Sequence, residues 1–246
     1  MTKKITALLF HRITKSKTNI WEDVQEEKFK HILELIGNQW LVSPDDKPVH
    51  NENWIVTFDD GLESDYNIVY PLLLKKKIKA IFFIIANRIG KPNYLNWDQI
   101  LEMSKNGMIF GSHGKSHKIM TELSIKEAKD ELLCSKNILE EKLNKNIRSF
   151  SFPYGYWNKE LIITAKEVGY DYIYTSQYGI VSKENNSYLP RNCINSSMNI
   201  KDIKKAMKPA NCYIFKRHIL QVILILIKTL IGKTNYIKLR NLIFKK

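Results

Sequence analysis

The stretch WIVTFDDG, residues 54–61, places two adjacent carboxylates directly after an apolar run. A short apolar run rich in β-branched and aromatic residues is typical of a buried strand. Asp59, Asp60 and Gly61 then form a sequence that favours a turn. The stretch therefore predicts a buried strand that ends at a pair of charged side chains.

Similar apolar runs recur along the chain and alternate with segments of helical period. The expected strands are residues 5–10, 54–58, 80–85, 108–111, 149–152 and 172–175, and the expected helices are 27–36, 63–76, 97–106, 124–143 and 158–168. Ser124 followed by Glu127 has the pattern of a capping box at the start of one helix. Alternating strands and helices indicate a parallel sheet with crossover helices, either a barrel or a doubly wound sheet.

Polar residues follow several of these strands at the point where each strand ends. They are His11, Asp59, Asp60 and His113, and the motif Pro153-Tyr154-Gly155 follows a further strand. Active sites of parallel α/β proteins are built where the carboxyl ends of the strands meet. We therefore expect these residues to converge on one site.

Two histidines near one of these strand ends indicate a metal site. His113 and His117, in SHGKSH, are four residues apart, a spacing that lets one helical face present both to a cation. One carboxylate of the Asp-Asp pair completes a set that leaves coordination positions open, and the other carboxylate is free to act as a base. Zinc is the default divalent metal for hydrolysis, and iron, cobalt or nickel suit the same ligands. A plain turn remains the alternative interpretation of Asp-Asp-Gly.

The motifs together resemble those of a known family. TFDDG at 57–61, SHGKSH at 112–117 and SFPYG at 151–155 resemble the polysaccharide deacetylases, also called the NodB-homology or carbohydrate esterase 4 family. LFHRI at 9–13, AIFFI at 80–84 and NWDQI at 96–100 agree with this resemblance, which runs from about residue 5 to about residue 195. It implies an α/β fold, a distorted, incomplete (β/α) barrel of the seven-stranded type with a C-terminal helical appendage.

The resemblance also implies a role for each residue of the metal site. Asp59 would be the general base that activates a metal-bound water. Asp60, His113 and His117 would be the metal ligands.

Other residues of the site are assigned in the same way. The backbone N–H of Tyr154 would help to form the oxyanion hole, and Phe152, Pro153 and Tyr154 would line the sugar groove. His11 resembles the N-terminal histidine of the branch that acts on poly-N-acetylglucosamine, and it would be the general acid.

The chain departs from the family at one position. The family often has an Arg that steadies the base aspartate where this chain has Ser151, and we expect Arg191 to take over that role. Asp171 is expected to orient a catalytic histidine. A surface salt bridge is the alternative interpretation of both residues.

Charge is distributed unevenly along the chain. The net charge is +14, and residues 199–246 carry 12 of the 39 Lys and Arg but one of the 25 acids. Such asymmetry suggests an anionic surface as a partner. Three cysteines without a CxxC pair argue against a thiolate metal site and a disulfide framework. The apolar run at 7–10 is shorter than the core of about 7–15 residues that a signal peptide needs, which favours a cytoplasmic protein.

The basic C-terminal segment contains an apolar stretch, residues 219–227, interrupted by Gln221. Cations at 216, 217 and 228 leave it short of the about 20 apolar residues of a spanning helix. An interfacial helix that docks residues 213–246 on an anionic membrane fits better, and a core helix with a basic outer side is the alternative. No nucleic acid is expected, because the segment lacks a known binding motif.

The expected organisation is a deacetylase domain at 1–198 and a helical segment at 199–246. The expected function is N-deacetylation of an N-acetylhexosamine in a polysaccharide or a lipid-linked glycan precursor, at the inner face of the membrane. An amidase or deformylase, a non-haem iron oxygenase and a catalytically silent glycan-binding or membrane scaffold protein are the alternatives. An oxygenase of this type needs one carboxylate ligand and has no role for a second aspartate, so the Asp59-Asp60 pair argues against it.

Overall fold

An all-parallel sheet forms the centre of the protein, of which the computed structural model describes residues 4–48, 50–181, 187–208 and 212–231. In sheet order the strands are β10 (Arg191–Cys193), β1 (Lys4–Phe10), β5 (Glu52–Phe58), β6 (Ile81–Ile84), β7 (Ile109–Ser112), β8 (Ser149–Ser151) and β9 (Tyr172–Tyr174), and β4 (Trp40–Leu41) pairs with β5. The six strands expected from the sequence are all present. The three-residue strand β10 and the short strands β2 (Ile13–Thr14), β3 (Val24–Gln25) and β4 were not expected.

The two outer strands of this sheet approach each other. Tyr174 of β9 forms a parallel bridge with Leu189, and Thr175 N donates to Leu189 O at 2.9 Å. Two residues further on, Arg191 N donates to Gln177 O at 2.9 Å. The sheet therefore curls into a nearly closed barrel of seven strands, and the predicted distorted, incomplete barrel is confirmed.

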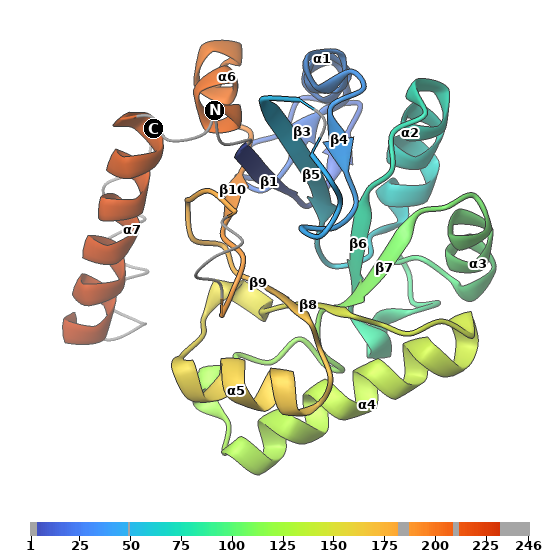
Figure 1. The fold of residues 1–246 in the computed structure, drawn as a ribbon, viewed down its shortest axis with the longest axis vertical. Coiled ribbons are helices and arrows are strands. Elements are labelled where there is room, and N and C mark those ends of the chain that lie inside the picture. The colour runs from blue at the N-terminus through green and yellow to red at the C-terminus, as the bar shows by residue number, and fades with distance from the viewer. Residues whose placement is uncertain (1–3, 49, 182–186, 209–211, 232–246) are drawn as a thin grey trace.

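Helices surround the sheet, as Figure 1 shows. They are α1 (Glu26–Ile36), α2 (Tyr70–Lys76), α3 (Trp97–Lys105), α4 (Ile125–Leu143) and α5 (Lys159–Glu167), with α6 (Ile200–Met207) and α7 (Cys212–Ile231) on the side of β10. The predicted capping box of α4 is confirmed, because Ser124 and Glu127 each accept a hydrogen bond from the other's backbone N–H. The expected helix at 63–76 is present but contains a π-helical turn, Asp65–Val69, near its start.

A ladder of phenylalanines packs the outer face of the sheet against the helices. Phe10, Phe58, Phe82 and Phe110 stand in register on adjacent strands, with ring centroids 5.3, 5.1 and 5.9 Å apart. Phe29 of α1 packs edge-on against two of them. Because side chains alternate along a strand, the residues next to each phenylalanine on its own strand face the barrel interior.

The barrel interior is filled mainly by apolar side chains from alternate positions. They include Ala7, Ile55, Ile81, Phe83 and Tyr174. At the level of Gly111 the strands come so close that an added Cβ would lie 2.6 Å from the Phe83 ring and 2.9 Å from a β8 carbonyl. A side chain at this position would push β7 away from its neighbours.

The C-terminal helices are held to the barrel by specific contacts. Trp54 Nε1 and Asn192 Nδ2 donate to carbonyls of Met207 and Ala206 at the end of α6. Ile214 of α7 packs in a small cluster with Leu9, Tyr178 and Cys193. No helix in the described ranges is long and apolar enough to cross a bilayer.

Candidate active site

A cavity of ≈ 450 Å³ opens at the carboxyl ends of the barrel strands. His11, Asp59, Asp60, His113 and His117 all contribute to its wall, as the sequence predicts. The rest of the wall consists of Leu9, Trp21, Glu22, Phe152, Tyr154, Gly155, Tyr156, Ser176, Tyr178, Cys193, Arg217 and Leu220. The cavity thus combines ionisable groups with aromatic surface, as small-molecule sites commonly do.

Three of these side chains form a cluster suited to a metal ion. One ligand atom each of Asp60, His113 and His117 lies within 4.8 Å of the other two. Asp60 Oδ1 is 3.5 Å from His113 Nε2 and 3.3 Å from His117 Nε2. This oxygen is buried and has no hydrogen-bond partner among the described residues. Since a buried carboxylate oxygen without a donor is costly, a cation at this position fits the donor set.

The orientation and charge state of His113 suit a metal ligand. Its Nδ1 is 2.8 Å from Ser151 O, and a carbonyl can only accept a hydrogen bond, so Nδ1 carries the proton. The lone pair of Nε2 is thereby turned toward Asp60. Burial lowers the pKa of His113, in spite of the opposing charges of Asp59 and Asp60, so the ring is held neutral as metal binding requires.

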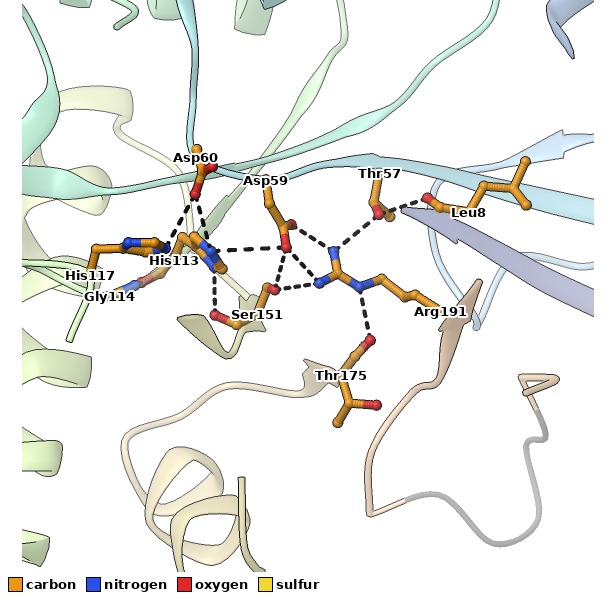
Figure 2. A network of polar contacts seen from close by, with 11 residues as sticks. Leu8, Thr57, Asp59, Asp60, His113, Gly114, His117, Ser151, Thr175 and Arg191 are labelled. Atoms are coloured by element: carbon orange, nitrogen blue, oxygen red, sulfur yellow. Dashed lines mark hydrogen bonds and ion pairs between the residues drawn. The ribbon is translucent and has the colours of Figure 1, made fainter. Parts of the chain in front are cut away.

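Asp59 lies beside this cluster but is engaged by a different partner. Arg191 of β10 donates from Nη1 to Asp59 Oδ1 and from Nη2 to Asp59 Oδ2, both at 2.7 Å (Figure 2). Ser151 Oγ donates to Asp59 at 3.1 Å and accepts from Arg191 at 2.6 Å. Burial by itself would raise the pKa of Asp59, but the charge and hydrogen bonds of Arg191, with His113, hold it well below its ordinary value.

Arg191 is fully buried, and its other donors are also used. Nη1 donates to Thr57 Oγ1 and Nε donates to Thr175 O, both at 3.1 Å (Figure 2). The guanidinium also lies over the rings of Phe83 and Tyr174, at 5.2 and 5.8 Å from their centroids. The sequence expectation placed Arg191 beside the base aspartate, and the structure brings the two together, with Ser151 between them.

Three residues of the site adopt left-handed backbone conformations that side chains disfavour. They are Asp60 with φ 79°, His117 with φ 61° and Tyr154 with φ 59°. Such conformations cost on the order of 1–3 kcal/mol each and persist where the surroundings impose them. Three of the six non-glycine residues with positive φ in the described part of the chain therefore lie in the cavity wall.

One residue that secures the site was not expected from the sequence. Glu131 of α4 is buried, and its Oε2 accepts hydrogen bonds from Lys115 N at 3.0 Å and from Ser116 N at 2.8 Å. Its Oε1 accepts a third bond from Ser116 Oγ. These contacts fix the loop between His113 and His117. The available signal was a charged residue among the apolar positions of a helix, since Glu131 shares the buried face of α4 with Ala128 and Leu132.

His11, the expected acid, follows β1 and lines the cavity. Its Nδ1 is buried and without a hydrogen-bond partner in the described part of the chain. Tyr154 is 61% exposed, and its ring packs on the His117 ring with centroids 4.5 Å apart. Phe152 also lines the cavity, whereas Pro153 is buried behind it and does not belong to its wall. The expectation that Pro153 contacts the sugar is corrected accordingly.

Asp171 does not lie where the sequence expectation placed it. Its carboxylate accepts a hydrogen bond from Arg148 Nε at 2.5 Å, and both side chains are half exposed. Asp171 immediately precedes β9, so it lies at the amino edge of the barrel, away from the strand ends that form the cavity. Its structural role is the surface salt bridge that the sequence left as the alternative.

Comparisons with known proteins agree with this geometry. The family model described as polysaccharide deacetylase matches residues 46–173, just over half of the chain. The chain is 27% identical over 194 residues to YxkH of Bacillus subtilis (strain 168), described as a candidate polysaccharide deacetylase, covering 75% of this chain and 69% of that protein. It is 30% identical over 154 residues to the poly-β-1,6-N-acetyl-D-glucosamine N-deacetylase of Staphylococcus aureus, covering 56% of this chain and 52% of that enzyme.

Solved structures share the same fold. The deacetylase PplD of Streptococcus pyogenes, solved with acetate, superposes with a TM-score of 0.76 at 26% identity, covering 84% of this chain and 99% of that chain. IcaB of Ammonifex degensii superposes with a TM-score of 0.72 at 21% identity, covering 84% and 96%. The matched motifs and the barrel together show that the chain belongs to the polysaccharide deacetylase family, carbohydrate esterase 4, whose deacetylases are hydrolases acting on C–N amide bonds.

Proposed function

We propose that this chain is a metal-dependent N-deacetylase that acts on an N-acetylhexosamine in a polysaccharide or a lipid-linked glycan precursor. The observation that carries the proposal is the pairing of two groups in one cavity. The Asp60, His113 and His117 cluster stands beside Asp59, a carboxylate that Arg191 keeps ionised. The staphylococcal relative is named for its action on poly-β-1,6-N-acetyl-D-glucosamine, which supports an acetylated amino sugar as the substrate of this chain.

In this proposal Asp60, His113 and His117 hold a divalent metal, and a nitrogen-rich set with one carboxylate favours zinc. When bound, such a metal lowers the pKa of a coordinated water from about 15.7 toward about 7 and polarises the acyl oxygen. Asp59 is not needed as a metal ligand, because both of its oxygens already accept hydrogen bonds from Arg191 and Ser151. These three bonds leave one of the about four lone-pair positions of the carboxylate for a proton.

The remaining residues handle the proton and the substrate. Asp59, held ionised and oriented, accepts the proton of the attacking water. His11, whose Nδ1 is not engaged elsewhere in the described structure, protonates the leaving amine. The backbone N–H of Tyr154 stabilises the developing oxyanion. The exposed ring of Tyr154 and the ring of Phe152 form apolar surface for the sugar.

We further propose that α7 docks the protein on an anionic membrane at the cytoplasmic face. Phe215, Ile219, Val222 and Ile223 recur at helical spacing and are exposed, which forms an apolar stripe. Twelve of the chain's Lys and Arg lie between residues 199 and 246. An exposed apolar stripe with flanking cations is the pattern of an interfacial helix.

Replacement of the base tests the chemistry. Asp59→Asn should lower kcat for acetate release about 10²–10⁴-fold, because an amide cannot accept the proton. The substrates are chitooligosaccharides, poly-β-1,6-N-acetylglucosamine oligomers and a lipid-linked N-acetylglucosamine, each with reconstituted metal. Metal content should stay unchanged in Asp59→Asn and fall in Asp60→Asn. The thermal stability of Asp59→Asn is measured as well, because Arg191 faces a neutral partner in this variant. Activity of Asp59→Asn near the wild-type level would exclude Asp59 as base.

Replacement of the acid should discriminate between leaving groups. His11→Gln should lower kcat for an N-acetyl sugar about 10²–10⁴-fold but leave hydrolysis of 4-nitrophenyl acetate far less affected, because an aryl oxide departs without protonation. Kinetics on both substrates at equal metal occupancy provide the measurement. An equal loss on both would assign His11 a role other than general acid.

Glu131 should affect the metal site through the loop that it holds. Glu131→Gln preserves the side-chain volume but weakens the three bonds to the loop, so metal affinity should fall about 10–100-fold. Titration of the metal-free protein with Co²⁺, followed by its visible absorption, measures this. Glu141→Gln, an exposed residue on the same helix, is the matched control, and equal Co²⁺ affinity in both variants would contradict the role.

The membrane proposal is tested with vesicles. Replacement of Phe215, Ile219 and Ile223 by Ser should weaken binding to vesicles of phosphatidylglycerol and phosphatidylcholine by on the order of tenfold or more, since less apolar surface is buried. Co-sedimentation measures the bound fraction, and Ile163→Ser, an exposed apolar residue of α5, is the control. Unchanged binding of the triple variant would refute docking through α7.

A further inference from the structure

The first turns of α7 form one side of the catalytic cavity. Arg217 and Leu220 belong to the same cavity wall as Asp60, His113 and His117. The helix is fixed there by Ile214, which packs with Leu9, Tyr178 and Cys193. His218 Nδ1 lies 3.2 Å from Tyr178 O and adds a polar contact between the helix and the barrel. The side chains of α7 therefore contact whatever occupies the cavity.

Arg217 is a partly buried cation that pairs with no carboxylate in the part of the chain that the structure describes. Its Nε donates to Tyr213 Oη at 3.2 Å, and its guanidinium lies over the Tyr213 ring, 5.2 Å from the centroid. Across the described part of the chain no Asp or Glu oxygen lies within 4.0 Å of it, whereas Arg12, Arg148 and Arg191 each pair with an aspartate. Among the described residues, the two terminal nitrogens of Arg217 have no hydrogen-bond partner and can therefore donate to a ligand.

The other charged groups of the cavity do not neutralise Arg217. Asp59 is paired with Arg191, and Asp60 belongs to the metal cluster. Glu22 also lines the cavity and makes no ion pair with Arg217. Two parallel N–H donors of a guanidinium match two oxygens of a phosphoryl group, which is why Arg is favoured at such sites.

From these contacts we propose that Arg217 binds a phosphoryl group attached to the amino sugar, so that the substrate is a lipid-linked glycosyl phosphate. The inference rests on the proposed deacetylase function. Three features of the site support it. Arg217 lines the same cavity as the candidate metal ligands, and the exposed apolar residues Leu220 and Ile223 follow it at helical spacing along α7. A substrate with an acetylated sugar, a phosphate and a hydrocarbon chain has one part to match each of these features.

Equilibrium binding tests the phosphate contact without catalysis. The full-length protein is used metal-free, so that phosphate cannot bind the metal, and is titrated with N-acetylglucosamine 1-phosphate and with N-acetylglucosamine. The phosphorylated sugar should bind about 10–100-fold more tightly, as a charge-assisted bidentate contact predicts. Arg217→Gln should abolish most of this difference, Arg217→Lys should retain part of it, and Lys216→Gln, which removes an exposed neighbouring charge, should retain it in full. Equal affinity for the two sugars, or an equal effect of Arg217→Gln on both, would overturn the phosphate contact.

Turnover with the metal-loaded protein identifies the source of the phosphate. Two substrates are compared: a polyprenyl-diphosphate-linked N-acetylglucosamine and UDP-N-acetylglucosamine. We expect kcat/KM to be about tenfold or more higher for the polyprenyl-linked sugar, because its polyprenyl chain can lie against α7. A preference for the nucleotide-linked sugar would overturn the lipid assignment. Absence of acetate release from these sugars and from neutral oligosaccharides would refute the deacetylase function instead, while the binding titration still reports on Arg217.

Discussion

The buried ion pair between Arg191 and Asp59 is the interaction on which the site depends. Withdrawing two charges from water costs several kcal/mol per ion, and the attraction between them offsets this cost only when the geometry is good and the other donors are satisfied. Here the pair is bidentate, and Thr57, Ser151 and the carbonyl of Thr175 take up the remaining hydrogen bonds. Thr57, Ser151 and Arg191 lie in β5, β8 and β10, and Thr175 directly follows β9, so the contacts that lower the pKa of Asp59 also connect four strands of the barrel.

The fold could be predicted from the sequence where local pattern and tertiary packing agree. Five of the six expected strands are short, mainly apolar runs, and the sixth, residues 149–152, alternates Ser with Phe. The capping box at Ser124 is visible in the sequence itself. Strand β10 was missed because its residues, Arg191 to Cys193, are polar and few, and they become a strand only by pairing with β1. The π-helical turn Asp65–Val69 was expected to be α-helical. One π-helical turn changes the spacing of apolar residues too little to be recognised in the sequence.

The candidate site divides in the same way. Asp60, His113 and His117 were found from their motifs, and the structure brings them together. The helix expected to present both histidines is absent, because residues 113–119 form an irregular loop in which His117 has φ 61°. Asp171 was misplaced because sequence proximity to a motif does not tell which edge of a sheet a residue occupies. Glu131 was missed because its partners are backbone N–H groups of a distant loop, and backbone donors are present at every residue of a sequence apart from proline.

The distribution of the site along the chain has a consequence for the order in which its parts are synthesised. The ribosome delivers Asp59 and the metal-binding side chains well before Arg191. A nascent chain without β10 therefore already has Asp60, His113 and His117, while Asp59 lacks the counter-charge that lowers its pKa inside the barrel. In the proposed mechanism such a chain would hold the candidate metal ligands without an ionised base. Deacetylation would then begin only once β10 has paired with β1.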